Sequence, residues 1–157
     1  MSELLRRFEK ANAKKTAENS GKHNMQKFIN SLKKRKIFRG EKLDSESLIV
    51  AQKLLVNMHL DFLPHSYVEF LKQYNGVKAE GAYLFGATVD DDLDIIDKNE
   101  QMRRPKNCIL LGYNEFDTLV YNFKKQLYQV IDREDFTVID EYKENEAGYA
   151  LSQIFSV

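Results

Sequence analysis

The chain has 157 residues, of which 43% are hydrophobic and 31% are charged, an ordinary composition for a soluble globular protein. This length suits one domain with a real core, and no run of eighteen apolar residues is present that would cross a membrane. The N-terminus carries no apolar stretch of the kind found in secretory signals, and a single cysteine excludes an internal disulfide. We therefore expect a cytoplasmic protein.

The formal net charge of zero conceals two oppositely charged parts. Residues 1–42 hold 13 Lys/Arg against 4 Asp/Glu, a net charge of +9, whereas residues 43–157 hold 11 against 20, a net charge of −9. A basic arm of this kind can bind nucleic acid or an acidic partner, or it can pack on the acidic part of its own chain. The acidic part favours a basic protein partner. We divide the chain into a basic, helical N-terminal extension (1–42) and a main domain (43–157).

Two amphipathic helices are predicted before residue 60. The first has apolar residues at the helical spacing i, i+3, i+4 and i+7, namely Met25, Phe28, Ile29 and Leu32. The basic run at residues 33–36 that follows favours a solvated helix end over a nucleic-acid contact, because cations suit the C-terminal dipole and no aromatic side chains are interleaved. Asp44 is a good cap for the second helix, whose apolar face includes Ala51 and Leu55.

The most distinctive stretch is residues 63–86, which read LPHSYVEFLKQYNGVKAEGAYLFG and are called the signature segment below. Pro64 suits the start of a helix, because its missing N–H would have no partner in the first turn. Gly76 can take a left-handed conformation after the helix at little steric cost. A strand over residues 82–85 is expected to follow. The face of the predicted helix consists of Tyr67, Phe70, Leu71 and Tyr74.

This segment resembles the core signature of the SUKH (Smi/Knr-like) superfamily. The matching pattern is Leu-Pro-x-x-Tyr-x-x-Phe-Leu-x-x-Tyr-Asn-Gly, followed by a strand that ends in Leu-Phe-Gly. The resemblance covers residues 40–157 and implies a SUKH-like α+β fold, whereas the basic first forty residues lie outside it. Family members are mostly bacterial immunity proteins that bind and neutralise a cognate toxin, and some are eukaryotic regulatory modules.

An acidic run, DDDLDIID, begins at Asp90. Asp90, Asp92 and Asp94 have the alternate spacing that opens a calcium-binding loop. Ile95 and Gln101, however, occupy the places where such a loop needs Gly and Glu, so no calcium site is expected. Two interpretations are open: a solvated acidic turn that leads into the next segment, or a binding surface for a basic partner.

The pattern after residue 107 changes to short alternating strands rich in Val, Ile, Tyr and Phe. We expect strands over residues 108–111, 118–123, 126–131 and 137–142. A final amphipathic helix is predicted from Ala147, Ala150, Leu151 and Ile154. The predicted elements occur in the order helices, then a run of strands, then a helix. This order predicts an α+β fold with a mostly antiparallel sheet of about five to six strands.

No motif in the sequence indicates a catalytic site. The three histidines are scattered, and Cys108 lies in the apolar run Cys-Ile-Leu-Leu, so neither a zinc site nor a reactive thiol is expected. The glycines are isolated, so there is no phosphate-cradling loop, and no Gly-x-Ser-x-Gly elbow is present. We therefore expect no enzyme activity, no metal and no cofactor.

We predict an immunity protein that occludes a cognate toxin with an acidic, aromatic-edged surface. A nuclease toxin suits such a surface, because its substrate groove must be basic to hold phosphates and opposite charges speed association. Two alternatives are a nucleic-acid-associated protein that uses the basic arm and a regulatory interaction module with no toxin. The predicted contact residues form two groups, Glu80, Tyr83, Asp90, Asp91, Asp92 and Asp94, and then Tyr113, Glu115 and Asp117.

Overall fold

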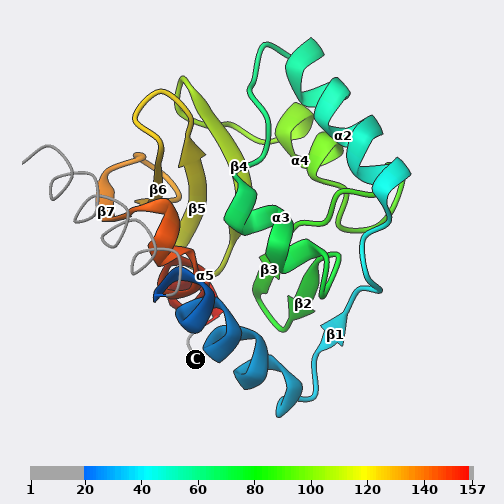
Figure 1. Ribbon diagram of the computed structural model, residues 1–157. Helices are drawn as coiled ribbons and strands as arrows, with labels where there is room; N and C mark the ends of the chain where they lie inside the picture. Colours follow the sequence, from blue (N-terminus) through cyan, green and yellow to red (C-terminus); the bar gives the residue numbers. More distant parts are fainter. Residues whose placement is uncertain (1–19, 156–157) are drawn as a thin grey trace, which may run out of the picture.

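One seven-stranded antiparallel sheet organises the protein (Figure 1). The structure is a computed structural model, and it describes residues 20–155. The strands lie side by side in the order in which they occur in the sequence. They are β1 (Phe38–Arg39), β2 (Val77–Ala79), β3 (Ala82–Leu84), β4 (Cys108–Tyr113), β5 (Asp117–Asn122), β6 (Leu127–Asp132) and β7 (Val138–Tyr142).

Helices cover the sheet at several places (Figure 1). A helix over residues 20–33, called the N-terminal helix below, lies beside α5, which packs against β3, β5, β6 and β7. On the other side of the view, α4 lies along β4, and α2 packs on α4. The remaining bounds are α2 (Ser45–Asn57), α3 (His65–Leu71), α4 (Ile95–Gln101), the 3-10 helix η1 (Glu144–Glu146) and α5 (Ala147–Phe155). No helix within residues 20–155 has the length and apolar character to cross a membrane.

The predicted α+β class with a mostly antiparallel sheet is confirmed, and the sheet is larger than expected. The two additional strands are β1 and β2, which have two and three residues. Strands this short contain at most one full alternation of side chains, so periodicity does not reveal them, and β3, which is as short as β2, was predicted from its place in the signature segment. Asp44 caps α2 as predicted, because its carboxylate accepts hydrogen bonds from the Ser47 backbone N–H at 2.8 Å and from the Ser47 hydroxyl at 2.9 Å.

The N-terminal helix is part of the main core. Its predicted apolar face is buried, with Met25, Phe28, Ile29 and Leu32 between 0% and 7% exposed. Asn24, itself 4% exposed, donates to the Asn145 carbonyl at 2.7 Å and accepts from the Gly148 N–H at 2.9 Å. A Cβ atom at Gly148 would lie 2.4 Å from the Asn24 carbonyl oxygen, so only glycine permits this approach. The predicted division at residue 42 is therefore not a break in the packing.

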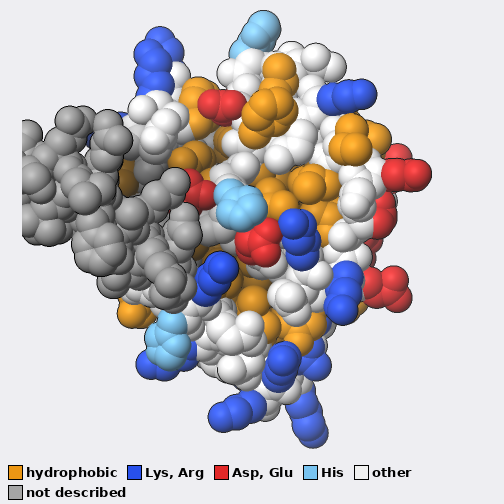
Figure 2. Space-filling view, in the orientation of Figure 1, with side chains coloured by type: hydrophobic (Ala, Val, Ile, Leu, Met, Phe, Trp, Pro, Cys, Tyr) orange, Lys and Arg blue, Asp and Glu red, His pale blue; other side chains and the backbone are white. Residues whose placement is uncertain are grey.

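Two arginines, Arg35 of the basic run and Arg39 of β1, satisfy carbonyls at the ends of α5 and of the N-terminal helix. The Arg39 guanidinium donates to the carbonyls of Leu32 and Arg35, each at 2.9 Å, and Arg35 donates to the Phe155 carbonyl at 2.9 Å. Carbonyls in the last turn of a helix have no partner within it, so these contacts satisfy groups that would otherwise need water. Lys and Arg side chains gather at this end of the molecule, at the bottom of Figure 2. Residues 1–19 of the basic arm lie outside the described residues.

The signature segment folds back on itself. Tyr67, on α3, is fully buried, and its hydroxyl donates to the carbonyl of Phe85 at 2.5 Å and to that of Leu111 at 3.2 Å. At its other end, the Asn75 side chain accepts from the Ala87 N–H at 2.7 Å, and a Cβ atom at Gly86 would lie 2.6 Å from the Asn75 carbonyl oxygen. Three residues of the pattern, Tyr67, Asn75 and Gly86, thus make contacts that hold the signature segment in its folded shape.

Two details of this segment can be compared with the prediction. Gly76 has φ +91°, the left-handed conformation expected after the helix. The helix itself is shorter than the periodicity suggested, since α3 ends at Leu71 and Tyr74 lies beyond it, half-buried. Tyr74 still packs against the core, and the Arg39 guanidinium lies 5.8 Å from the centre of its ring.

Cys108 is buried on β4, as expected, and this gives a chemical prediction. Burial penalises the thiolate and raises the pKa of Cys108 from its usual 9.0 to about 11. Since the thiolate is the reactive species, alkylation by iodoacetamide at pH 8 should be at least about 100-fold slower in the folded protein than in urea. Mass spectrometry of timed samples measures both rates. Equal rates in the two conditions would show that the thiol is accessible in the native state.

Candidate partner-binding surface

The first predicted group lies around a hollow at the β2–β3 hairpin. This hollow has a volume of about 510 Å³ and is called the hairpin hollow below. Glu80, Tyr83 and Asp92 line it, although Asp92 belongs to a different segment from the other two. Lys36 and Phe38, which come from the chain before and within β1, line it as well. The sheet and the turn before α4 thus bring three of the nine predicted contact residues into one concave site.

Three exposed carboxylates form an acidic turn at one side of this hollow. Asp90, Asp91 and Asp92 are exposed, and Asp90 has a left-handed φ of 68°, a conformation that Asp tolerates better than most residues. Among residues 20–155, none of the three pairs with a Lys, Arg or His side chain within ion-pair distance. Within the part of the chain that the structure describes, the turn therefore presents concentrated negative charge without a salt-bridge partner.

Asp94, the fourth predicted aspartate, has a different position. It is only 4% exposed, and its carboxylate accepts hydrogen bonds from the Ile96 N–H at 2.9 Å and from the Asp90 N–H at 3.0 Å. It caps α4 and holds the acidic turn in shape. Because both carboxylate oxygens are engaged within the fold, we assign Asp94 a positioning role and exclude it from the contact surface.

The two predicted groups are joined by a pair of tyrosines. Tyr83 and Tyr113 are opposite each other on β3 and β4, and the centres of their rings are 4.8 Å apart. Lys78 lies 6.0 Å from the Tyr83 ring centre, and Arg133 lies 4.6 Å from the Tyr113 ring centre. Burial, assisted by the neighbouring Tyr83, raises the pKa of Tyr113, so its hydroxyl is a neutral donor and acceptor at physiological pH. The result is an aromatic stripe with a cation at each end.

The second predicted group lies at the β4–β5 turn. Glu115 is exposed, whereas Asp117 is half-buried opposite Asp132 on β6. Burial, with the charges of Asp132 and Asp140 adding to it, raises the pKa of the Asp117 carboxyl. Phe116, between the two predicted residues, is 71% exposed. An aromatic side chain at the tip of a turn is a typical anchor for a partner, and sequence reasoning missed it because no periodic pattern marks a turn.

Phe38 was missed for another reason. It is 59% exposed, and it faces Lys78 across β1 and β2, in line with Tyr83 and Tyr113 on the next two strands. Only the pairing of β1 with β2 places it there. The only sequence signal was an aromatic residue beside the basic run, which by itself predicts nothing about the sheet.

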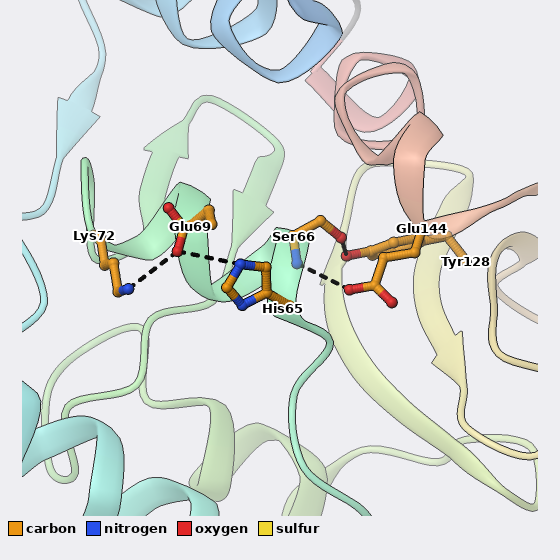
Figure 3. A network of polar contacts seen from close by, with 6 residues as sticks. All are labelled: His65, Ser66, Glu69, Lys72, Tyr128 and Glu144. Atoms are coloured by element: carbon orange, nitrogen blue, oxygen red, sulfur yellow. Dashed lines mark hydrogen bonds and ion pairs between the residues drawn. The ribbon is translucent and has the colours of Figure 1, made fainter. Parts of the chain in front are cut away.

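A second polar cluster lies at the start of α3 and has a structural role (Figure 3). The Ser66 hydroxyl and the buried Tyr128 hydroxyl are 2.6 Å apart, and the Ser66 N–H donates to Glu144 at 3.1 Å. Glu144 thus satisfies a backbone donor in the first turn of α3. The His65 imidazole lies 3.6 Å from Glu69, which also pairs with Lys72 at 3.0 Å. Since His65 pairs with Glu69 and not with Ser66, the cluster lacks the serine–base contact that activates a nucleophile.

Within residues 20–155, no three or more His, Cys, Asp and Glu side chains are grouped so as to hold a metal ion. No protein-family model matches the chain, and none of the curated proteins matches it. A functional conclusion therefore depends on the surface just described and on the resemblance carried by the signature segment.

Proposed function

We propose that this chain is an immunity protein of the SUKH type, which binds a cognate toxin in the cytoplasm and neutralises it by covering its basic surface. The observation that carries the proposal is the exposed acidic turn of Asp90, Asp91 and Asp92, of which Asp92 lines the hairpin hollow together with Glu80 and Tyr83. The resemblance of the signature segment to the SUKH pattern supports the same function. Neither observation requires an enzyme activity in this chain.

The chemistry of the surface suits a basic protein partner. Like charges in adjacent positions repel each other, so three exposed aspartates in one turn oppose folding electrostatically. A basic partner removes this repulsion, and long-range attraction raises the rate at which the two proteins meet. The exposed aromatic side chains Phe38 and Phe116, with the half-buried Tyr83, supply the apolar contact area that holds a complex once it has formed.

Neutralising the acidic turn should slow association and leave the fold intact. The triple change Asp90→Asn, Asp91→Asn, Asp92→Asn keeps the size of each side chain, and Asn tolerates the left-handed conformation at position 90. At low salt we expect the association rate with the toxin encoded beside this gene to fall roughly tenfold and to depend less on salt. Surface-binding kinetics at several ionic strengths measure both effects, and protection of a toxin-expressing cell should fall in parallel.

A matched control separates the turn from the total charge. The variant Glu46→Gln, Glu100→Gln, Glu134→Gln removes the same number of exposed carboxylates at other places. Its association rate should stay within about twofold of the parent. An unchanged rate in the aspartate variant, or an equal fall in the control, contradicts the acidic-surface mechanism.

A further inference from the structure

The end of α2 and the segment that connects α4 to β4 enclose a second hollow, with a volume of about 450 Å³. Three of its ten lining residues are cationic, namely Arg103, Arg104 and Lys106, and none is acidic. This composition is notable because residues 43–157 as a whole carry a net charge of −9. The site is called the basic hollow below.

The positive charge of this hollow is not neutralised within the described fold. Among residues 20–155, no Asp or Glu lies within ion-pair distance of Arg103, Arg104 or Lys106. Lys125, in the turn between β5 and β6, is two residues from the lining residue Phe123. Arg104 and Lys125 both act to lower the pKa of Cys108, against the larger effect of burial, so both charges lie close to β4.

The two arginines are held in position before any ligand binds. Asn99, 1% exposed, donates to the Leu110 carbonyl at 3.0 Å and accepts from the Leu110 N–H at 2.8 Å, which fixes the end of α4 against β4. The Arg104 guanidinium donates to the Asn99 carbonyl. Arg103 lies 5.3 Å from the centre of the Phe136 ring. Each guanidinium has five N–H donors, so these contacts leave donors free for an anion.

We infer that the basic hollow binds a small organic phosphate of about mononucleotide size. Planar guanidinium groups match the oxygens of a phosphate in pairs, and two oriented arginines with a neighbouring lysine suit a dianion better than a single carboxylate. The volume lies within the range of small-molecule sites. Met58, Met102 and Phe123 line the same hollow and provide an apolar surface for a flat ring attached to the phosphate. This site contains none of the residues of the proposed toxin-binding surface.

The test measures binding of AMP, adenosine, inorganic phosphate and a single-stranded oligonucleotide to the full chain by calorimetry and NMR. We expect AMP to bind, inorganic phosphate to bind at least tenfold more weakly and adenosine not to bind at millimolar concentration. The methyl signals of Met58 and Met102 should shift on addition of AMP. No binding of AMP at millimolar concentration overturns the proposal. Binding of the oligonucleotide without binding of AMP also overturns it, in favour of a nucleic-acid surface.

The variant that tests the site changes two exposed cationic residues of the basic hollow. Arg103→Gln with Lys106→Gln should weaken AMP binding at least tenfold, while circular dichroism shows an unchanged fold. The matched control is Lys33→Gln with Lys34→Gln, which removes two exposed positive charges at the end of the N-terminal helix. AMP affinity in this control should equal that of the parent. Equal weakening in both variants, or in neither, overturns the assignment of the site.

Discussion

A chain that begins at Glu41 is expected to be unable to fold, although the family resemblance covers almost all of what it contains. The deletion removes four buried side chains, Met25, Phe28, Ile29 and Leu32. Full burial of each contributes about 1.5–3 kcal/mol, and their sum is comparable with the whole stability of a typical domain, roughly 5–15 kcal/mol. It also removes β1 and the hydrogen bonds that Asn24 makes to Asn145 and Gly148.

The control for this deletion begins at Ser20. It lacks about half of the basic arm but keeps all four core residues and Asn24. Thermal unfolding followed by circular dichroism should show a cooperative transition for this control and none for the chain that begins at Glu41. If both truncated chains unfold at the same temperature as the parent, the N-terminal helix contributes no stability and its packing has been misinterpreted.

Phe70→Ala should be the most damaging single truncation in the signature segment. Phe70 is fully buried, with its ring centre 5.8 Å from that of Phe28 and 5.7 Å from that of Tyr67, so it connects the N-terminal helix to α3. Truncation of a buried Phe to Ala typically costs about 3–5 kcal/mol, because apolar contacts are lost and a cavity is left. The free energy of unfolding from urea titration measures the loss.

Phe62→Ala is the matched control for this truncation. Phe62 lies just before the signature segment and is 57% exposed, so the same change should alter the free energy of unfolding by no more than about 0.5 kcal/mol. A Phe70→Ala protein that unfolds like the parent and has lost only its binding activity would mean that the signature segment is a contact site and not a core.

Local patterns predicted the fold class, the N-terminal helix, α2, the start of α3 and α5, because such patterns report on a single element, whereas α4 was not predicted. The spacing of Met25 to Leu32 and the cap at Asp44 depend only on neighbours within one or two turns. What the sequence could not reveal depends on contacts between distant segments. The short strands β1 and β2 exist because they pair with each other and with β3, and the signature glycine Gly86 is required because Asn75 approaches it.

The sequence predicted which kinds of residue make up the candidate surface, but it did not predict how they are arranged. A run of aspartates signals negative charge, but only the fold shows that Asp94 is buried while its three neighbours are exposed. Likewise, Phe38 reaches the hairpin hollow from β1, more than forty residues before Tyr83. The basic hollow was missed entirely, because its residues come from three separate segments, and no one of them has a pattern of its own.

The contact between Asn24 and Gly148 joins residues 124 positions apart, and it has a consequence for how the protein is made. The N-terminal helix leaves the ribosome well before α5, against which it packs. At roughly 5–20 residues per second, the apolar face of Met25 to Leu32 waits about 6–25 seconds for that partner. During this interval the nascent chain has a basic segment whose apolar side chains have not yet reached their partner, so we expect slower translation to lengthen the time for which they are open to aggregation or to a chaperone.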